Sequence, residues 1–76
     1  MSLKPKKRSL TLHGHQTSVS LEDRFWQAFC DIAEEKKIAI NSLAAKIDGD
    51  RDLKSGLASA LRNYVLDYYI DKCKHF

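Results

Sequence analysis

The stretch His15-Gln16-Thr17-Ser18-Val19-Ser20-Leu21 decides the fold of this 76-residue chain. From Gln16 onward, alternate residues are apolar or β-branched, and the residues between them are polar. This period of two predicts a half-buried β-strand over about residues 15–21, with one face on a core and one in solvent. The inner face is Thr17, Val19 and Leu21, and the outer face is Gln16, Ser18 and Ser20.

The residues before this strand change the face on which apolar side chains fall. Leu10 and Leu12 are apolar on even positions, whereas the strand is apolar on odd positions. A strand cannot switch its buried face without an inserted or kinked residue, and Gly14 is the natural place for a bulge or bend. We therefore expect residues 8–13 to form a separate extended segment.

A single strand cannot pair its own backbone N–H and C=O groups. Unless residues 8–13 fold back, the simplest completion is the same strand from a second copy, antiparallel across a two-fold axis. Such a two-stranded ribbon fits the major groove of DNA, where its outward side chains reach base edges.

Three helices are expected after the strand, at about residues 22–37, 41–48 and 53–74. Apolar residues recur every three or four positions in each, as in amphipathic helices. Ser20 and Asp23 have the spacing of a capping box, so Ser20 either caps the first helix or faces DNA. Asn41 is a good N-cap for the second helix, and Gly49 is expected to end it. The third helix has more apolar surface than a lone helix needs, so a partner should cover it.

The net charge of +3 is unevenly distributed. Residues 1–15 carry four cations and no acid, which gives +4, and residues 16–76 carry 9 cations and 10 acids, which gives −1. A basic, flexible arm over residues 1–8 indicates contact with a phosphate backbone, and a solubilising tail is the alternative. Its cations are Lys4, Lys6, Lys7 and Arg8.

Composition excludes several classes. The two cysteines lie in no CxxC or Cys/His cluster, so neither a disulfide framework nor structural zinc is expected, and free thiols suit the cytoplasm. His13 and His15 lack a third metal ligand. The sequence contains no run of 18 apolar residues, so no membrane span is expected. Without a Ser-His-Asp set or a Gly-rich phosphate loop, we expect no enzyme and no cofactor. What remains is a soluble, oligomeric binding module.

The order strand, helix, tight connector, helix resembles the ribbon-helix-helix family of bacterial DNA-binding proteins. The resemblance rests on residues 15–22 with Phe25-Trp26, and on Asn41-Ser42-Leu43-Ala44. The segments Arg8-Ser9-Leu10-Thr11-Leu12 and Ser59-Ala60-Leu61-Arg62 are similar to a small uncharacterised subfamily.

The resemblance implies a mainly α fold with one short strand: an intertwined homodimer with an intermolecular two-stranded antiparallel ribbon and an extra C-terminal helix, over residues 9–76. It implies binding of double-stranded DNA as a transcriptional regulator, with assembly beyond the dimer left open. Carried over by position, Gln16, Ser18 and Ser20 contact bases, and Asn41 and Ser42 hold a phosphate. A dimeric adaptor or antitoxin-like module, docking a protein partner through the third helix, is the alternative.

Overall fold

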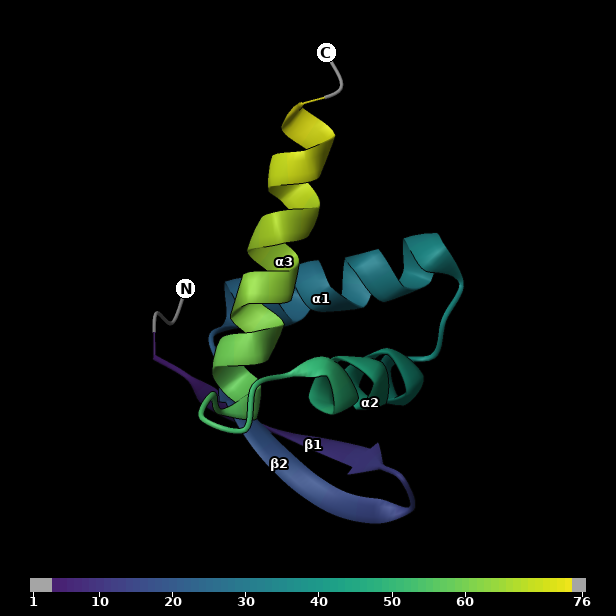
Figure 1. Cartoon of the computed structure of the whole chain (residues 1–76), viewed down its shortest axis with the longest axis vertical. Coiled ribbons are helices and arrows are strands. Elements are labelled where there is room, and N and C mark those ends of the chain that lie inside the picture. Colours follow the sequence, from purple (N-terminus) through teal and green to yellow (C-terminus); the bar gives the residue numbers. More distant parts are fainter. Residues whose placement is uncertain (1–3, 75–76) are drawn as a thin grey trace.

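A computed structural model describes residues 4–74. Two strands come first and three helices follow (Figure 1). The strands lie at one end of the molecule with α2 directly over them, and α3 crosses in front of α1 (Figure 1). The elements are β1 Lys6–Leu12, β2 His15–Leu21, α1 Asp23–Lys36, α2 Ile40–Asp50 and α3 Leu57–Cys73.

The partner of β2 is β1 of the same chain, so the expectation of one strand is wrong. The two strands pair antiparallel, from Lys6 opposite Leu21 to Leu12 opposite His15. His13 and Gly14 both have positive φ, at 53° and 81°. Positive φ at both loop residues defines a type I′ turn, whose twist matches that of paired strands. The change of apolar face around Gly14 therefore marks a hairpin turn.

The core lies between the hairpin and the helices. Leu10, Leu12, Val19 and Leu21 form the inner face of the hairpin and are at most 7% exposed. The two strands contact different helices: α2 packs against β1, and α3 packs against β2. The helices contribute Phe29, Ile32, Ala33, Leu43, Ala44, Ile47, Leu61 and Val65 to the same cluster.

The helix boundaries differ from the expected ones for local reasons. The N-cap of α1 is Glu22 and that of α2 is Ala39, neither with a side-chain capping bond, so Ser20 and Asn41 are not caps. Helix α2 continues through Gly49. Helix α3 begins only at Leu57 because the preceding loop folds around Arg51. The guanidinium of Arg51 donates to Asp48 Oδ1 at 2.7 Å and to the carbonyls of Asp52 and Ser55.

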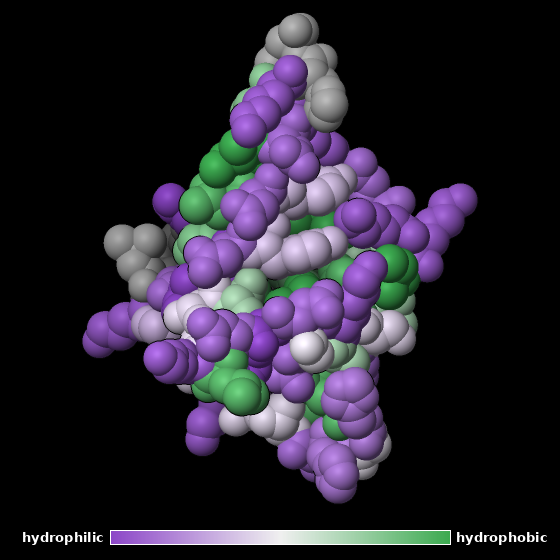
Figure 2. Space-filling model, viewed as in Figure 1, coloured by the Kyte–Doolittle hydropathy of each residue, from purple (hydrophilic) through white to green (hydrophobic). Residues whose placement is uncertain are grey.

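Helix α3 is covered on only one side. It packs against both α1 and α2. Its outer side leaves Leu66, Tyr69 and Ile70 40–54% exposed, and Figure 2 shows apolar surface along the upper part of this helix. Among residues 4–74, no helix is long and apolar enough to cross a lipid bilayer.

Candidate nucleic-acid interface

The outer face of the hairpin is a polar surface built by both strands. Partners in an antiparallel pair project on the same face, so each outward residue of β2 has an outward neighbour on β1. All six side chains are exposed, and none is apolar. We call this surface the outer face: Lys7 opposite Ser20, Ser9 opposite Ser18, and Thr11 opposite Gln16.

Gln16, Ser18 and Ser20 thus lie together on one exposed surface, away from the buried Val19 and Leu21. Sequence reasoning missed the contribution of β1: Lys7, Ser9 and Thr11. The sequence did contain a signal for this strand. Leu10 and Leu12 alternate with polar residues and form its inner face, at even positions, whereas the inner face of β2 lies at odd positions.

The basic residues of the N-terminal segment do not form one patch. Because β1 begins at Lys6, residues 6–8 belong to the sheet and not to a flexible arm. Lys6 and Arg8 lie on the inner side and pair with Asp23, with Lys6 Nζ 3.4 Å from Oδ2. Lys7 alone of these three projects from the outer face. Lys4 is exposed just before the strand, and residues 1–3 lie outside the described residues.

Arg8 is a packed structural residue. Its guanidinium lies 5.6 Å from the ring centroid of Trp26, and its side chain is only 18% exposed. It donates to an Asp23 carboxylate oxygen and to the carbonyl oxygen of Leu21. The hydrogen bond from Arg8, followed by that from Lys6, holds the pKa of Asp23 below its usual value, whereas partial burial opposes this shift.

A second ion pair fixes α3 to the end of β2. Arg62 forms a two-pronged contact with Glu22, with Nε and Nη2 at 2.9 and 3.1 Å from the carboxylate oxygens. Its Nη2 also donates to the carbonyl of Ser20 at 3.4 Å. The hydrogen bond from Arg62 is the main cause that lowers the pKa of Glu22.

Asn41 and Ser42 lie in the first turn of α2, next to β1. The backbone N–H of Thr11 donates to Asn41 Oδ1 at 3.1 Å, so Asn41 ties this turn to the edge of the hairpin. The first turn contains no acidic residue. Its leading backbone amides have no acceptor within the helix, and such amides at the positive end of a helix favour anions.

The hairpin tip borders a groove of about 370 Å³, with His13 and His15 on one side and Asp48, Arg51 and Leu57 on the other. Within residues 4–74, no three or more His, Cys, Asp and Glu side chains lie together in a metal-binding arrangement.

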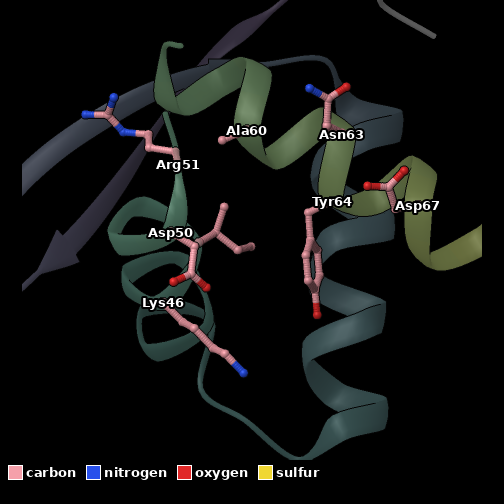
Figure 3. Close-up of a pocket in the computed structure, with 8 residues that line it drawn as sticks. Lys46, Asp50, Arg51, Ala60, Asn63, Tyr64 and Asp67 are labelled. Carbon is pink, nitrogen blue, oxygen red and sulfur yellow. The ribbon is translucent and has the colours of Figure 1, made fainter. Parts of the chain in front are cut away.

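A groove of about 230 Å³ separates α2 from α3 (Figure 3). Lys46 and Asp50 lie on the α2 side and face Tyr64 across the gap (Figure 3). Its lining contains neither Ser, Cys nor His, so it holds no nucleophile paired with an imidazole base.

Comparison with known proteins assigns the family. A model of the ribbon-helix-helix domain matches residues 5–69, which include the hairpin, α1, α2 and most of α3. The chain belongs to the ribbon-helix-helix family. No curated protein and no solved structure matches it.

Proposed function

We propose that this protein binds double-stranded DNA in a sequence-dependent manner and acts as a transcriptional regulator, as a homodimer in the manner of its family. The observation that carries the proposal is the outer face, a two-stranded ribbon with only polar side chains on its exposed side. A ribbon of this width enters the major groove.

The outer face suits base contact better than β2 alone. Gln16 can make two hydrogen bonds to an adenine, whereas Ser18 and Ser20 discriminate less between bases. Lys7 adds a cation at the far end of the ribbon from the turn, and it can contact guanine or a phosphate. Short side chains at Ser9 and Ser18 let the backbone approach the base edges closely.

The phosphate contacts should flank the ribbon. The free amides of α2 at Asn41 and Ser42 lie along the β1 edge, where a phosphate of one DNA strand would pass. Lys7 adds positive charge there, whereas Lys6 and Arg8 are paired with Asp23.

Fluorescence anisotropy on genomic fragments at several salt concentrations tests the proposal. Eight neutralised phosphates would give a slope of log affinity against log salt of about −7. Because Asp23 holds two cations of each chain, we expect a clearly shallower, yet negative, slope. A flat salt dependence would count against DNA binding.

Matched substitutions locate the contact surface. Gln16→Ala should reduce the preference for the best fragment over random DNA, while Gln27→Ala, on α1, should not. Lys7→Ala should weaken binding to all DNA fragments about equally, whereas Lys46→Ala, on α2, should have little effect on affinity. Equal effects within either pair would mean that the outer face is not the contact surface.

A protein-binding module is the second candidate, favoured by the exposed apolar side of α3. The double variant Leu66→Ser/Ile70→Ser discriminates between the two. If DNA affinity is unchanged while a protein partner is lost, α3 serves a separate docking role.

A further inference from the structure

We propose that this protein bridges two segments of DNA, through antiparallel pairing of α3 in one homodimer with α3 in a second homodimer. This inference rests on the proposed function and adds an assembly step to it. The contact surface is the exposed apolar side of α3, which we call the outer stripe: Leu66, Ile70 and Cys73, with Tyr69 beside them.

The outer stripe faces away from the core of its own chain. Its residues are spaced by three and four positions, so they share one side of the helix. The buried Leu61 and Val65 lie on the other side, whereas Leu66 is 54% and Ile70 is 42% exposed. Figure 2 shows this apolar surface on the upper part of α3. A row of exposed apolar side chains of this kind marks a contact with another molecule.

The charges beside the outer stripe favour a second copy of α3 as the occupant. Asp67 and Lys74 are both exposed, and their seven-residue spacing puts them on the same side of the helix. Neither takes part in an ion pair within residues 4–74. In an antiparallel pair centred on Ile70, Asp67 of each copy lies level with Lys74 of the other. The surface is therefore complementary to itself and gives two identical ion pairs, as a two-fold interface requires.

The place of the outer stripe in the fold decides what the contact joins. Helix α3 runs along the length of the molecule, with the hairpin near its first residues and the outer stripe toward its C-terminal end (Figure 1). Leu57, which lines the groove beside the hairpin, lies about 20 Å along the helix from Ile70 at 1.5 Å per residue. Antiparallel pairing thus places the hairpins of the two copies about 40 Å apart, at opposite ends of the pair. Their outer faces point away from each other, toward two different duplexes.

The contact is small, so it should depend on DNA. Stable interfaces bury about 1,200–2,000 Å² in total, and two helical turns from each copy bury less than this. The pairing should therefore be weak between free homodimers. It gains strength where several homodimers lie on one DNA fragment, because their local concentration is high and several contacts form together.

A capture assay with two DNA fragments tests the inference. One copy of the best-bound genomic fragment is fixed to beads, protein is added, and the retention of a second, fluorescent copy is measured. We expect wild type to retain the second copy. The double variant Leu66→Ser/Ile70→Ser should retain at least tenfold less, with unchanged affinity for a single fragment by anisotropy. Leu53→Ser is the matched control, since Leu53 is 95% exposed outside the outer stripe, and it should retain as much as wild type.

The outcomes of this assay separate the inference from the proposed function. If wild type binds the fixed fragment and retains no second copy, the inference is overturned and the proposed function stands. Full retention by the double variant, or an equal loss in Leu53→Ser, would also overturn the inference. No binding to any fragment would overturn both.

Exchange of the two charges identifies the occupant as a second copy. Asp67→Lys puts like charges opposite each other and should reduce retention about three- to tenfold. Adding Lys74→Asp to this variant should restore retention to within about twofold of wild type. Only a contact between two copies of α3 is repaired in this way. Retention that is unchanged in Asp67→Lys, or not restored in Asp67→Lys/Lys74→Asp, would overturn the antiparallel pairing.

Discussion

Replacing Gly14 with alanine should destabilise the protein, whereas the same replacement at Gly49 should stabilise it. Gly14 has φ +81°, a conformation that costs an L-residue about 1–2 kcal/mol. Gly49 lies within α2, and a Cβ there would meet nothing within 4 Å. Alanine is favoured over glycine in a helix by up to about 1 kcal/mol, and near the helix end about 0.5 kcal/mol is reasonable.

The two variants should therefore differ by roughly 1.5–2.5 kcal/mol in the free energy of unfolding. In a domain of this size, about 1 kcal/mol corresponds to 4–8 °C in Tm, so their midpoints should differ by roughly 6–20 °C. Circular dichroism during heating, with urea titrations at a fixed temperature, measures both. Since the turn positions the outer face, Gly14→Ala should also weaken DNA binding, and Gly49→Ala should not.

Equal stability of the two variants would refute this reasoning, because it would mean that residues 13–14 do not form the turn. His13→Asn is an independent check at φ 53°, since asparagine tolerates left-handed backbone better than histidine. It should raise Tm by a few degrees without changing the helical circular dichroism signal.

Three further predictions concern the core, the ion pairs and the thiols. Phe29→Ala removes a fully buried ring and should cost about 3–5 kcal/mol, measured by urea denaturation. Because the pKa of Asp23 is lowered in the folded state, its stabilising effect is complete above the unfolded pKa of about 3.9 and is lost as the pH falls through the folded value. Asp23→Asn should therefore be less stable than wild type at neutral pH, and this difference in unfolding free energy should disappear at low pH. Equal stability at neutral pH would mean that Asp23 does not pair with Arg8 in solution. Burial raises the pKa of Cys30, while Cys73 is exposed, so mass spectrometry should find Cys73 alkylated first.

The outward residues of β2 and the buried Val19 and Leu21 were predictable, because alternation along a strand depends only on local geometry. Thr17, which was also expected on the core, is exposed. The hairpin was harder to predict, because its turn sequence His13-Gly14 lacks the asparagine or aspartate that usually precedes glycine in a type I′ turn. The change of apolar face between residues 12 and 17 was recognised in the sequence. It could not be interpreted uniquely, because a one-residue bulge and a two-residue hairpin turn both move the buried residues from even to odd positions.

The destination of the basic residues could not be read from the sequence. Lys6, Lys7 and Arg8 look alike as a run of positive charge. Once they are in a strand, alternation sends Lys7 outward and the other two inward. The acid that receives them, Asp23, follows the end of β2 by two residues, and the pairing of Lys6 with Leu21 in the hairpin brings it close.

The choice between pairing within a chain and pairing between chains follows from the length of the connection. Closing a two-residue loop restricts very few residues, and the entropic cost of loop closure grows only slowly with length. A second copy must instead lose translational and rotational freedom, which costs at least about 4 kcal/mol at the 1 M standard state and more at cellular concentrations. β2 therefore pairs with β1 before it can meet another chain, and Arg62 then lies on the edge that remains. A dimer that pairs through this edge must displace Arg62 from Ser20, so Arg62→Ala should promote self-association, measured by sedimentation.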